Sequence, residues 1–382
     1  MATPQPPSQD RPRSESGQVL NPAAVVLWRS VGVLQLELGS RRIVIDNVRP
    51  EQLSALLDRP GHRWAGRRAA DDRPADRARP EPNAATRAKQ PTGQGPELAE
   101  LTRVLAAAGF LTDRPARAPV GSAALPAQFG PDLGALTGRH GNHGPAVLAA
   151  RRRAAVAVHG NSRITTTVAS TLASAGVGWV QLVPAGEVSA GESCPGGLAP
   201  ADEGDRFAVA GVQAMLRNTP SVRSDPLPAS RPADLVILTD PAPVEPSIRA
   251  SLHLDGVAHL PASVDGSRAV IGPLVLPGVT SCLRCADLHR CERDPAWPRL
   301  AIQLAGRPRR RATSDVSLCV ATAGLTAGQA LAYLDRGEPE TLNATLEWQL
   351  PDWQLRRRRW ISHHDCDCGA ATRPAKDGRM AW

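Results

Sequence analysis

Two close pairs of cysteines constrain the fold of this chain more than any other feature of its sequence. Cys282 and Cys285 form a C-x-x-C motif in "TSCLRCADL", and Cys366 and Cys368 form a C-x-C motif near the C-terminus. Four thiolates suit the tetrahedral coordination of zinc, and a closed set of four leaves no open position for a catalytic water. The sequence therefore predicts a structural zinc site that joins these two segments.

The other three of the seven cysteines lack such spacing. Cys319 lies in an apolar helical pattern, so we expect it in the core, and Cys194 stands alone. Some residues lie close enough in sequence to replace one of the predicted zinc ligands, and this alternative stays open. They are His289, Cys291, His363 and His364.

Strand and helix patterns alternate after residue 149. Short apolar runs typical of buried strands occur in "AAVAVHG", "GWVQLV", "ADLVILTD" and "GVAHLPASV", with helical patterns between them. A further apolar helical pattern spans residues 315–337 and is expected to cover one face of the sheet. Alternating strands and helices are typical of a parallel sheet with right-handed crossovers. We therefore predict an α/β domain with a Rossmann-like sheet and helices on both faces.

Residues 24–58 and 96–112 have the pattern of a small α+β module. Apolar residues alternate roughly in "VGVLQLEL" and in "IVIDNV", which predicts strands. Pro50 suits the first turn of a helix, and a second helix in "PELAELTRVLAAAGF" is expected to stop at Gly109. This order predicts a winged-helix-like module.

The amino-acid composition along the chain indicates where the domains begin and end. Residues 1–23 and 59–95 are polar or proline-rich with few large apolar residues, so we expect a disordered tail and a disordered insertion. Residues 113–148 are rich in proline, glycine and alanine and are predicted to be a linker. The chain would then consist of the module at 24–112, split by its insertion, and a domain at 149–382.

The net charge of +8 raises the question of nucleic-acid binding. Lys89 and Lys376 are the only lysines, so the positive charge is nearly all arginine, as the coding bias of a GC-rich genome would produce. Three arginine runs are candidate anion-binding patches, but none is interleaved with aromatic residues. They are Arg151–Arg153, Arg309–Arg311 and Arg356–Arg359. We favour a solvated basic surface without nucleic acid.

The turn after the first strand of the larger domain is where a mononucleotide-binding fold would hold phosphate. It reads "GNSRIT", so Gly160 is the only glycine of a G-x-G-x-x-G pattern, followed by Asn161, Ser162 and Arg163. Pro184 stands where an acidic ribose ligand would follow the second strand. We therefore do not expect intact ATP binding. The sequence also has no Walker loop and no G-x-S-x-G elbow.

The order of these motifs resembles the ThiF/MoeB superfamily, the adenylating fold shared with ubiquitin-activating enzymes. The resemblance covers residue 150 to the C-terminus. It includes "GDRFAVAGVQAMLRNTP", "DLVILTD" ending at Asp240, the apolar segment "GPLVLPG" as a buried strand, and the two cysteine pairs. In the family, a glycine-rich turn, a ribose-binding acid, a lysine and a metal-binding aspartate activate a carboxylate. Here Arg206 stands in place of the lysine and only Asp240 is retained, which implies an eroded, non-catalytic site.

The combination of this domain with a winged-helix-like module resembles the cyclodehydratase-partner, or leader-peptide-binding, proteins of thiazole/oxazole-modified peptide (bacteriocin) biosynthesis. The resemblance implies that a precursor peptide adds as a strand beside the third strand of the module. The peptide would then be presented to a separate YcaO-type enzyme that uses ATP. The matching residues are Arg42, Ile43, Val44, Ile45 and Leu53. For Val44 and Leu53, burial in the core of the module is the simpler alternative.

Two other functions stay open. An ATP-dependent adenylating enzyme would have to bind ATP despite Ser162 and Pro184. A winged-helix DNA-binding regulator would read bases with the helix "PEQLSALLD", which contains no arginine or lysine. We expect a cytoplasmic protein, because the chain has no apolar run of about 18 residues and its first residues lack the apolar core of a secretory signal. Relatives of the fold often dimerise, so a homodimer is compatible with the resemblance.

Overall fold

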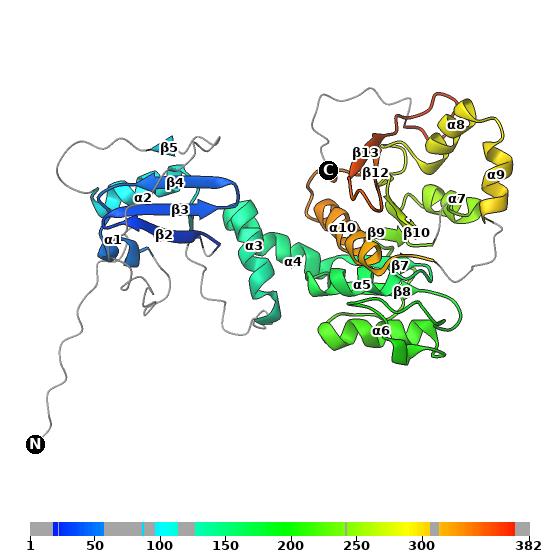
Figure 1. Cartoon of the computed structure of the whole chain (residues 1–382), viewed down its shortest axis with the longest axis horizontal. Coiled ribbons are helices and arrows are strands. Elements are labelled where there is room, and N and C mark those ends of the chain that lie inside the picture. The colour runs from blue at the N-terminus through cyan, green and yellow to red at the C-terminus, as the bar shows by residue number, and fades with distance from the viewer. Residues whose placement is uncertain are drawn as a thin grey trace, which may run out of the picture. The chain divides into compact units, whose positions relative to one another are not determined.

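The computed structural model describes residues 18–21, 23–56, 86–87, 96–113, 127–240, 243–305 and 313–370, with only the backbone at 86–87. The chain divides into two compact units, residues 1–148 and 149–382 (Figure 1). Each unit has its own sheet and core and is described separately.

The first unit contains a small sheet in the order β2-β3-β4-β5. The antiparallel strands β2 (Val25–Ser30), β3 (Val33–Leu38) and β4 (Arg41–Ile45) follow one another along the chain. The last strand, β5 (Thr86–Arg87), pairs with β4 in parallel. Side chains of β3 alternate between buried and half-buried, because one face of the sheet covers the core.

Two helices pack on the core of this unit. They are α1 (Pro50–Ser54) and α2 (Leu98–Ala107), and Gly109 follows α2 with a left-handed φ of +72°, as its sequence predicts. The core combines leucines of the strands, the helices and the adjoining turns with Phe110. The predicted strands and helices of the module are therefore present, whereas its winged-helix character stays a prediction.

Two boundary predictions for this unit need correction. The predicted tail 1–23 includes β1 (Gln18–Leu20), which pairs with β6 (Leu111–Asp113) because Val19 and Leu20 are buried. The predicted linker 113–148 contains 3-10 turns at Ala127–Phe129 and Gly141–His143, and helix α3 (Gly130–His140). Helix α4 (Gly144–Arg153) begins there as well. Of the predicted insertion 59–95, residues 59–85 and 88–95 lie outside the described residues.

The second unit contains a seven-stranded sheet in the order β13-β12-β11-β10-β9-β7-β8. Four strands are parallel, as predicted: β7 (Ala155–His159), β8 (Trp179–Val183), β9 (Leu235–Leu238) and β10 (His259–Asp265). Three antiparallel strands that the sequence analysis did not predict extend the sheet: β11 (Arg268–Ile271), β12 (Ala344–Gln349) and β13 (Arg356–Arg359).

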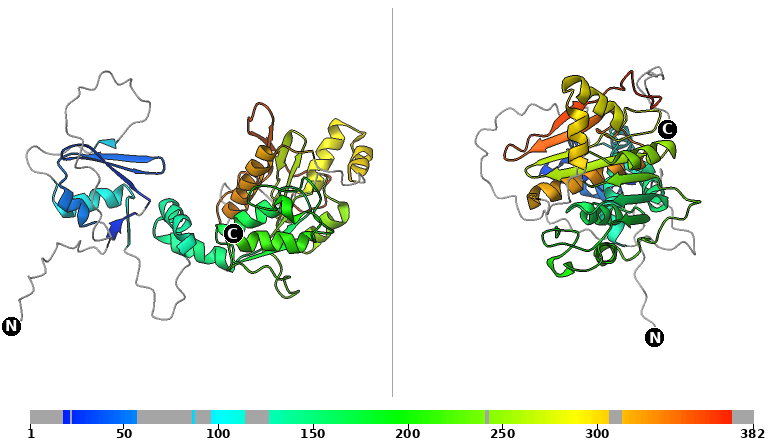
Figure 2. Two further views of the ribbon diagram at one scale, coloured as in Figure 1. Left: turned by 60° about the horizontal axis from the view of Figure 1, so that its bottom comes forward. Right: turned by 90° about the vertical axis from the view of Figure 1, so that its right-hand side faces the viewer.

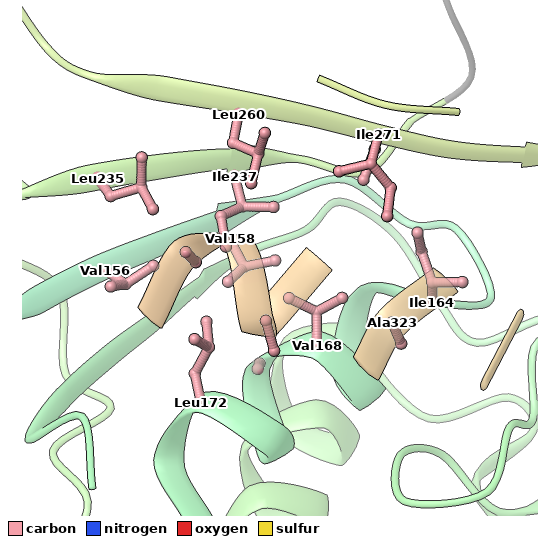
Figure 3. Close-up of a cluster of buried hydrophobic side chains, with 14 of the residues drawn as sticks. Val156, Val158, Ile164, Val168, Leu172, Leu235, Ile237, Leu260, Ile271 and Ala323 are labelled. Atoms are coloured by element: carbon pink, nitrogen blue, oxygen red, sulfur yellow. The ribbon is translucent and has the colours of Figure 1, made fainter. Parts of the chain in front are cut away.

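Helices cover both faces of this sheet. On one face, side chains of β7 and β9 meet Val168 and Leu172 of α5 and Ala323 of α10 (Figure 3). On the other face, Leu252 of α7 packs against alternate residues of the same strands. The helices of the unit after α4 are α5 (Thr165–Ser174), α6 (Phe207–Asn218), α7 (Pro246–Leu254), α8 (Leu283–Arg293), α9 (Trp297–Ala305) and α10 (Val316–Leu334), with a 3-10 turn at Pro200–Asp202.

Helix α10 is the predicted helix that covers the sheet, and it lies along α5, β10 and β11 (Figure 2). By length and composition alone it is also apolar enough to cross a membrane, and 44% of its most apolar window is buried inside the protein. A buried ion pair joins its end to α4: Arg151 donates to both carboxylate oxygens of Asp335 at 2.7 and 2.6 Å. Losing one partner of such a pair typically costs about 3–5 kcal/mol.

The segment "GPLVLPG", residues 272–278, is buried but is not the regular strand that the sequence analysis predicted. It makes only isolated bridges, from Leu274 to Leu342 and from Val275 to His259. Pro273 and Pro277 have no backbone N–H to donate, and Gly272 has a φ of +93°, so a continuous ladder cannot form.

Candidate functional site

The two cysteine pairs meet in one buried cluster. Cys282 lies just before the first residue of α8 and Cys285 lies in its first turn, while Cys366 and Cys368 come from the loop that follows β13. The four sulfur atoms lie within 4.8 Å of one another, and all four residues are buried. The structure therefore brings together the four residues that the sequence analysis named.

The distances in this cluster fit a metal and not a disulfide. The Sγ atoms of Cys282 and Cys285 are 3.8 Å apart, and the pairs Cys282–Cys366 and Cys285–Cys368 are each 3.6 Å apart. A disulfide would require about 2.05 Å. Four sulfurs placed tetrahedrally at the usual zinc–sulfur distance of about 2.3 Å are about 3.8 Å apart. The cluster has nearly the dimensions of a zinc tetrahedron.

The thiols of the cluster cannot all ionise without a cation. Hydrogen bonds, above all from the Cys282 thiol, lower the pKa of Cys285 to about 4, and burial raises the pKa of Cys366 to about 12. Donating that hydrogen bond raises the pKa of Cys282. A divalent cation would compensate the negative charge of four thiolates, and its binding would release the remaining protons.

Polar contacts hold the loop of the second pair against α8. Arg284 donates to both carboxylate oxygens of Asp367 at 2.7 and 2.8 Å. His363 Nε2 lies 2.9 Å from Glu292 Oε1, and His363 Nδ1 accepts from the backbone N–H of Asp365. Hydrogen bonds from His289 and His363 lower the pKa of Glu292.

These contacts bear on the alternative ligands that the sequence left open. His289 and His363 form a separate group with Glu292, and Cys291 and His364 are not members of the four-cysteine group. The sequence analysis missed the roles of Arg284, Glu292 and Asp367. Their only signal in the sequence is their proximity to the cysteine pairs.

The turn between β7 and α5 is closed on itself. Gly160 has a φ of +121°, and the backbone N–H of Asn161 donates to Asp240 Oδ1 at 2.9 Å. Thr165 Oγ1 lies 2.7 Å from Thr239 Oγ1, and Thr239 in turn donates to the carbonyl of His159. Burial lowers the pKa of His159, which the Asp240 carboxylate opposes. An aspartate thus occupies the place where the turn would offer a backbone N–H to phosphate.

The basic residues predicted at this turn do not converge on it. Arg163 donates to the carbonyls of Ser193 and Ser314 at 2.8 and 2.7 Å, so its guanidinium ties neighbouring loops together. Arg206 is the residue just before α6 and is exposed. Ser162 stays in the turn, with its Oγ 3.3 Å from Thr165 Oγ1. Of the predicted nucleotide-binding residues, the structure brings Gly160, Asn161, Ser162 and Asp240 together at the turn.

Two cavities lie at opposite ends of the parallel strands. One, of about 70 Å³, lies beside Asp240 and is lined in part by Arg249 and Asp287. The other, of about 330 Å³, lies at the start of β9 and β10, next to Asp234. Sites for small molecules usually measure about 300–1,000 Å³. The cavity next to Asp234 falls within this range, and the one beside Asp240 lies below it.

The predicted peptide-binding residues lie on β4 and α1. Arg42 is exposed and forms an ion pair with Glu37 at 3.0 Å. Ile43, Ile45 and Leu53 belong to the buried core of the first unit, and Val44 is also buried. Core packing, the simpler alternative for Val44 and Leu53, accounts for both side chains. The backbone edge of β4 pairs in part with β5.

Comparison with known proteins shows the fold. No model of a protein family matches the sequence, and no curated protein matches it. The structure of E. coli MccB with succinimide matches with a TM-score of 0.63 and 14% identity, over 93% of this chain and 99% of that chain. The microcin C7 biosynthetic enzyme MccB in complex with N-formylated MccA gives 0.62 and 14%, over 92% and 99%.

A third structure, of PaaA, matches with a TM-score of 0.53 and 16% identity, over 68% of this chain and 90% of that chain. At these identities the likeness concerns the fold alone. The fold expected from the resemblance to the ThiF/MoeB superfamily is therefore confirmed, in an arrangement that spans nearly the whole length of MccB.

Proposed function

We propose that this chain is a non-catalytic protein that binds a ribosomally made precursor peptide and presents it to a separate YcaO-type, ATP-dependent cyclodehydratase. The observation that carries the proposal is the closed turn after β7. The backbone N–H of Asn161 donates to Asp240. The side chains of Thr165 and Thr239 form a hydrogen bond at the place where a glycine-rich turn would leave space for phosphate. A turn whose first backbone N–H is already engaged supports a binding role rather than nucleotide chemistry.

The peptide part of the proposal draws on the first unit and on the comparisons. MccB has been solved with the peptide MccA, and the match to that complex extends over 92% of this chain. In this chain, β4 and its short neighbour β5 form one edge of the sheet, and strand edges bind extended peptides through main-chain hydrogen bonds. We assign peptide binding to this edge.

The four-cysteine cluster has a structural role in this proposal. Zinc, held by Cys282, Cys285, Cys366 and Cys368, would fasten the C-terminal loop to α8. With four thiolate ligands the coordination is complete, so the metal would stabilise the fold and activate no water.

A second candidate is an ATP-dependent adenylating enzyme. Asp240 at the end of β9 and Gly160 in the turn favour it, since both belong to the pattern of the adenylating fold. MccB has also been solved with ATP, and with AMPCPP together with MccA. ATP would then have to open the contact between Asn161 and Asp240.

One pair of measurements separates the two candidates. The tagged full-length protein is used to capture partners from its native cytosol, with mass spectrometry of the eluate. The purified protein and its Asp240→Asn variant are then assayed for ATP–pyrophosphate exchange. The scaffold predicts a captured peptide or YcaO-type enzyme and no exchange above background. Exchange that is lost in Asp240→Asn would establish the enzyme, and salt-sensitive capture of DNA would favour a regulator.

A further inference from the structure

A second group of side chains that can bind a metal lies beside the cysteine cluster. His289 and Glu292 lie in α8, three residues apart, and His363 comes from the loop that follows β13. One ligand atom from each of the three residues lies within 4.8 Å of the other two. The side chain of His363 is 3% exposed, that of His289 22% and that of Glu292 52%, so solvent reaches the carboxylate.

Both ring nitrogens of His289 face hydrogen-bond acceptors. Nε2 lies 3.1 Å from the carbonyl oxygen of Ile361, and Nδ1 lies 3.2 Å from Glu292 Oε2. A neutral imidazole has one N–H and can donate to only one of them. With Nε2 donating to the carbonyl, the lone pair of Nδ1 points at a carboxylate, which is repulsive unless a cation lies between them. A histidine that binds a metal typically donates its other N–H to a backbone carbonyl in this way.

His363 approaches the same carboxylate from another segment of the chain. Its Nε2 lies 2.9 Å from Glu292 Oε1, and the rings of His289 and His363 meet edge to face with their centroids 4.7 Å apart. Ligand atoms at about 2.1 Å from a tetrahedral metal are about 3.4 Å apart. The distances of 3.2 and 2.9 Å between the two rings and Glu292 are close to this value. With a metal on Nε2, the ring proton of His363 would move to Nδ1, which would give up the hydrogen bond from the N–H of Asp365.

We propose that His289, Glu292 and His363 form a second metal site, which binds a divalent transition-metal ion such as Zn²⁺, Ni²⁺ or Co²⁺. Imidazole ligands suit these ions, and a carboxylate supplies the negative charge. Three protein ligands leave at least one coordination position open to water or to another ligand, unlike the closed set of four cysteines. This inference concerns the second unit alone and does not depend on peptide binding.

The second site should bind metal more weakly than the cysteine cluster. It has one ligand fewer, and two of its three side chains are partly exposed, whereas all four cysteines are buried. The metal must also displace the proton that lies between His289 and Glu292 in its absence. The purified protein should therefore retain metal in the cysteine cluster, and the second site should fill when metal is added.

A cobalt titration tests the site. Full-length protein with zinc in the cysteine cluster is titrated with Co²⁺, and binding is followed by calorimetry and visible absorption. The wild type should bind about one further equivalent, without the charge-transfer bands of thiolate-bound cobalt. His289→Gln and Glu292→Gln should each weaken this binding by about tenfold or more, since each removes a ligand. The zinc content of both variants should equal that of the wild type.

Two further variants serve as controls. Glu338→Gln makes the same charge change at an exposed residue of the second unit, and among the described residues Glu338 belongs to no metal-ligating group. It should bind Co²⁺ as the wild type does. His364→Gln tests a neighbouring group, because His363 also lies close to His364 and Asp365.

Three results would overturn the proposal. The first is no further Co²⁺ binding by the wild type, which would show that His289 and Glu292 share only a proton. The second is loss of binding in His364→Gln with full binding in Glu292→Gln, which would place the metal in the neighbouring group. The third is the appearance of thiolate charge-transfer bands, which would show that cobalt enters the cysteine cluster instead.

Discussion

Gly160 determines how closely Asp240 can approach the turn after β7. A Cβ atom at this position would lie 2.5 Å from Thr239 Oγ1 and 2.7 Å from Asp240 Oδ1, and the φ of +121° is one that other residues rarely adopt. A glycine is needed here so that the carboxylate can accept the N–H of Asn161. Gly160, which in the sequence indicated a phosphate-binding turn, therefore allows the hydrogen bond between Asn161 and Asp240 in this structure.

We predict that Gly160→Ala destabilises the protein by about 2–4 kcal/mol, because it adds steric overlap to an unfavourable φ. The control is Gly204→Ala, where φ is +87° but no atom lies within 4 Å of the added Cβ, so the loss should be about 1 kcal/mol. Both values follow from urea unfolding of the purified proteins. Equal losses would show that crowding at Thr239 and Asp240 is unimportant.

Residue-level reasoning from the sequence found only part of this site. It identified Gly160, Asp240 and the four cysteines, since each belongs to a local pattern of glycine, strand-end aspartate or close cysteines. It missed the hydrogen bond between the side chains of Thr165 and Thr239, because the two residues are 74 positions apart and neither belongs to a recognisable motif. Such contacts depend on which strands become neighbours in the sheet.

At the scale of elements, the cysteine cluster couples the start of α8 to the loop after β13. We predict that Cys285→Ser loses the bound zinc and several kcal/mol of stability together, because the site would lack one of four ligands. Cys291→Ser should change neither, since Cys291 lies outside the cluster. Metal content by atomic emission and urea unfolding test this. A wild-type protein that is well folded without metal would contradict it.

The elements that the sequence predicted well are those with a strong local pattern. The alternation of β7, α5, β8, α6, β9, α7 and β10 follows from apolar runs and helical faces. The antiparallel strands were missed for a physical reason: β13 consists of four exposed arginines, whose strand form depends on pairing with β12. Likewise, α3 lies in a segment rich in glycine, but Phe129, Leu136 and Leu148 form a small core there.

At the scale of the whole molecule, each of the two units has its own hydrophobic core and is stabilised by it. The main core cluster of the first unit contains only residues from Leu20 to Phe110, and that of the second only residues from Val156 to Trp348. The four cysteines belong to the second unit. Metal should therefore stabilise one unit directly and not the other.

We predict two transitions in differential scanning calorimetry of the full-length protein, each with its own response. Leu53→Ala, which empties a fully buried position in the first unit, should lower one transition by about 10 °C or more, because such truncations cost about 2–5 kcal/mol. Chelation by EDTA should lower only the other transition, and zinc should restore it. If both changes shift a single common transition, the two units unfold as one, and the loss of zinc would then also weaken the edge of β4.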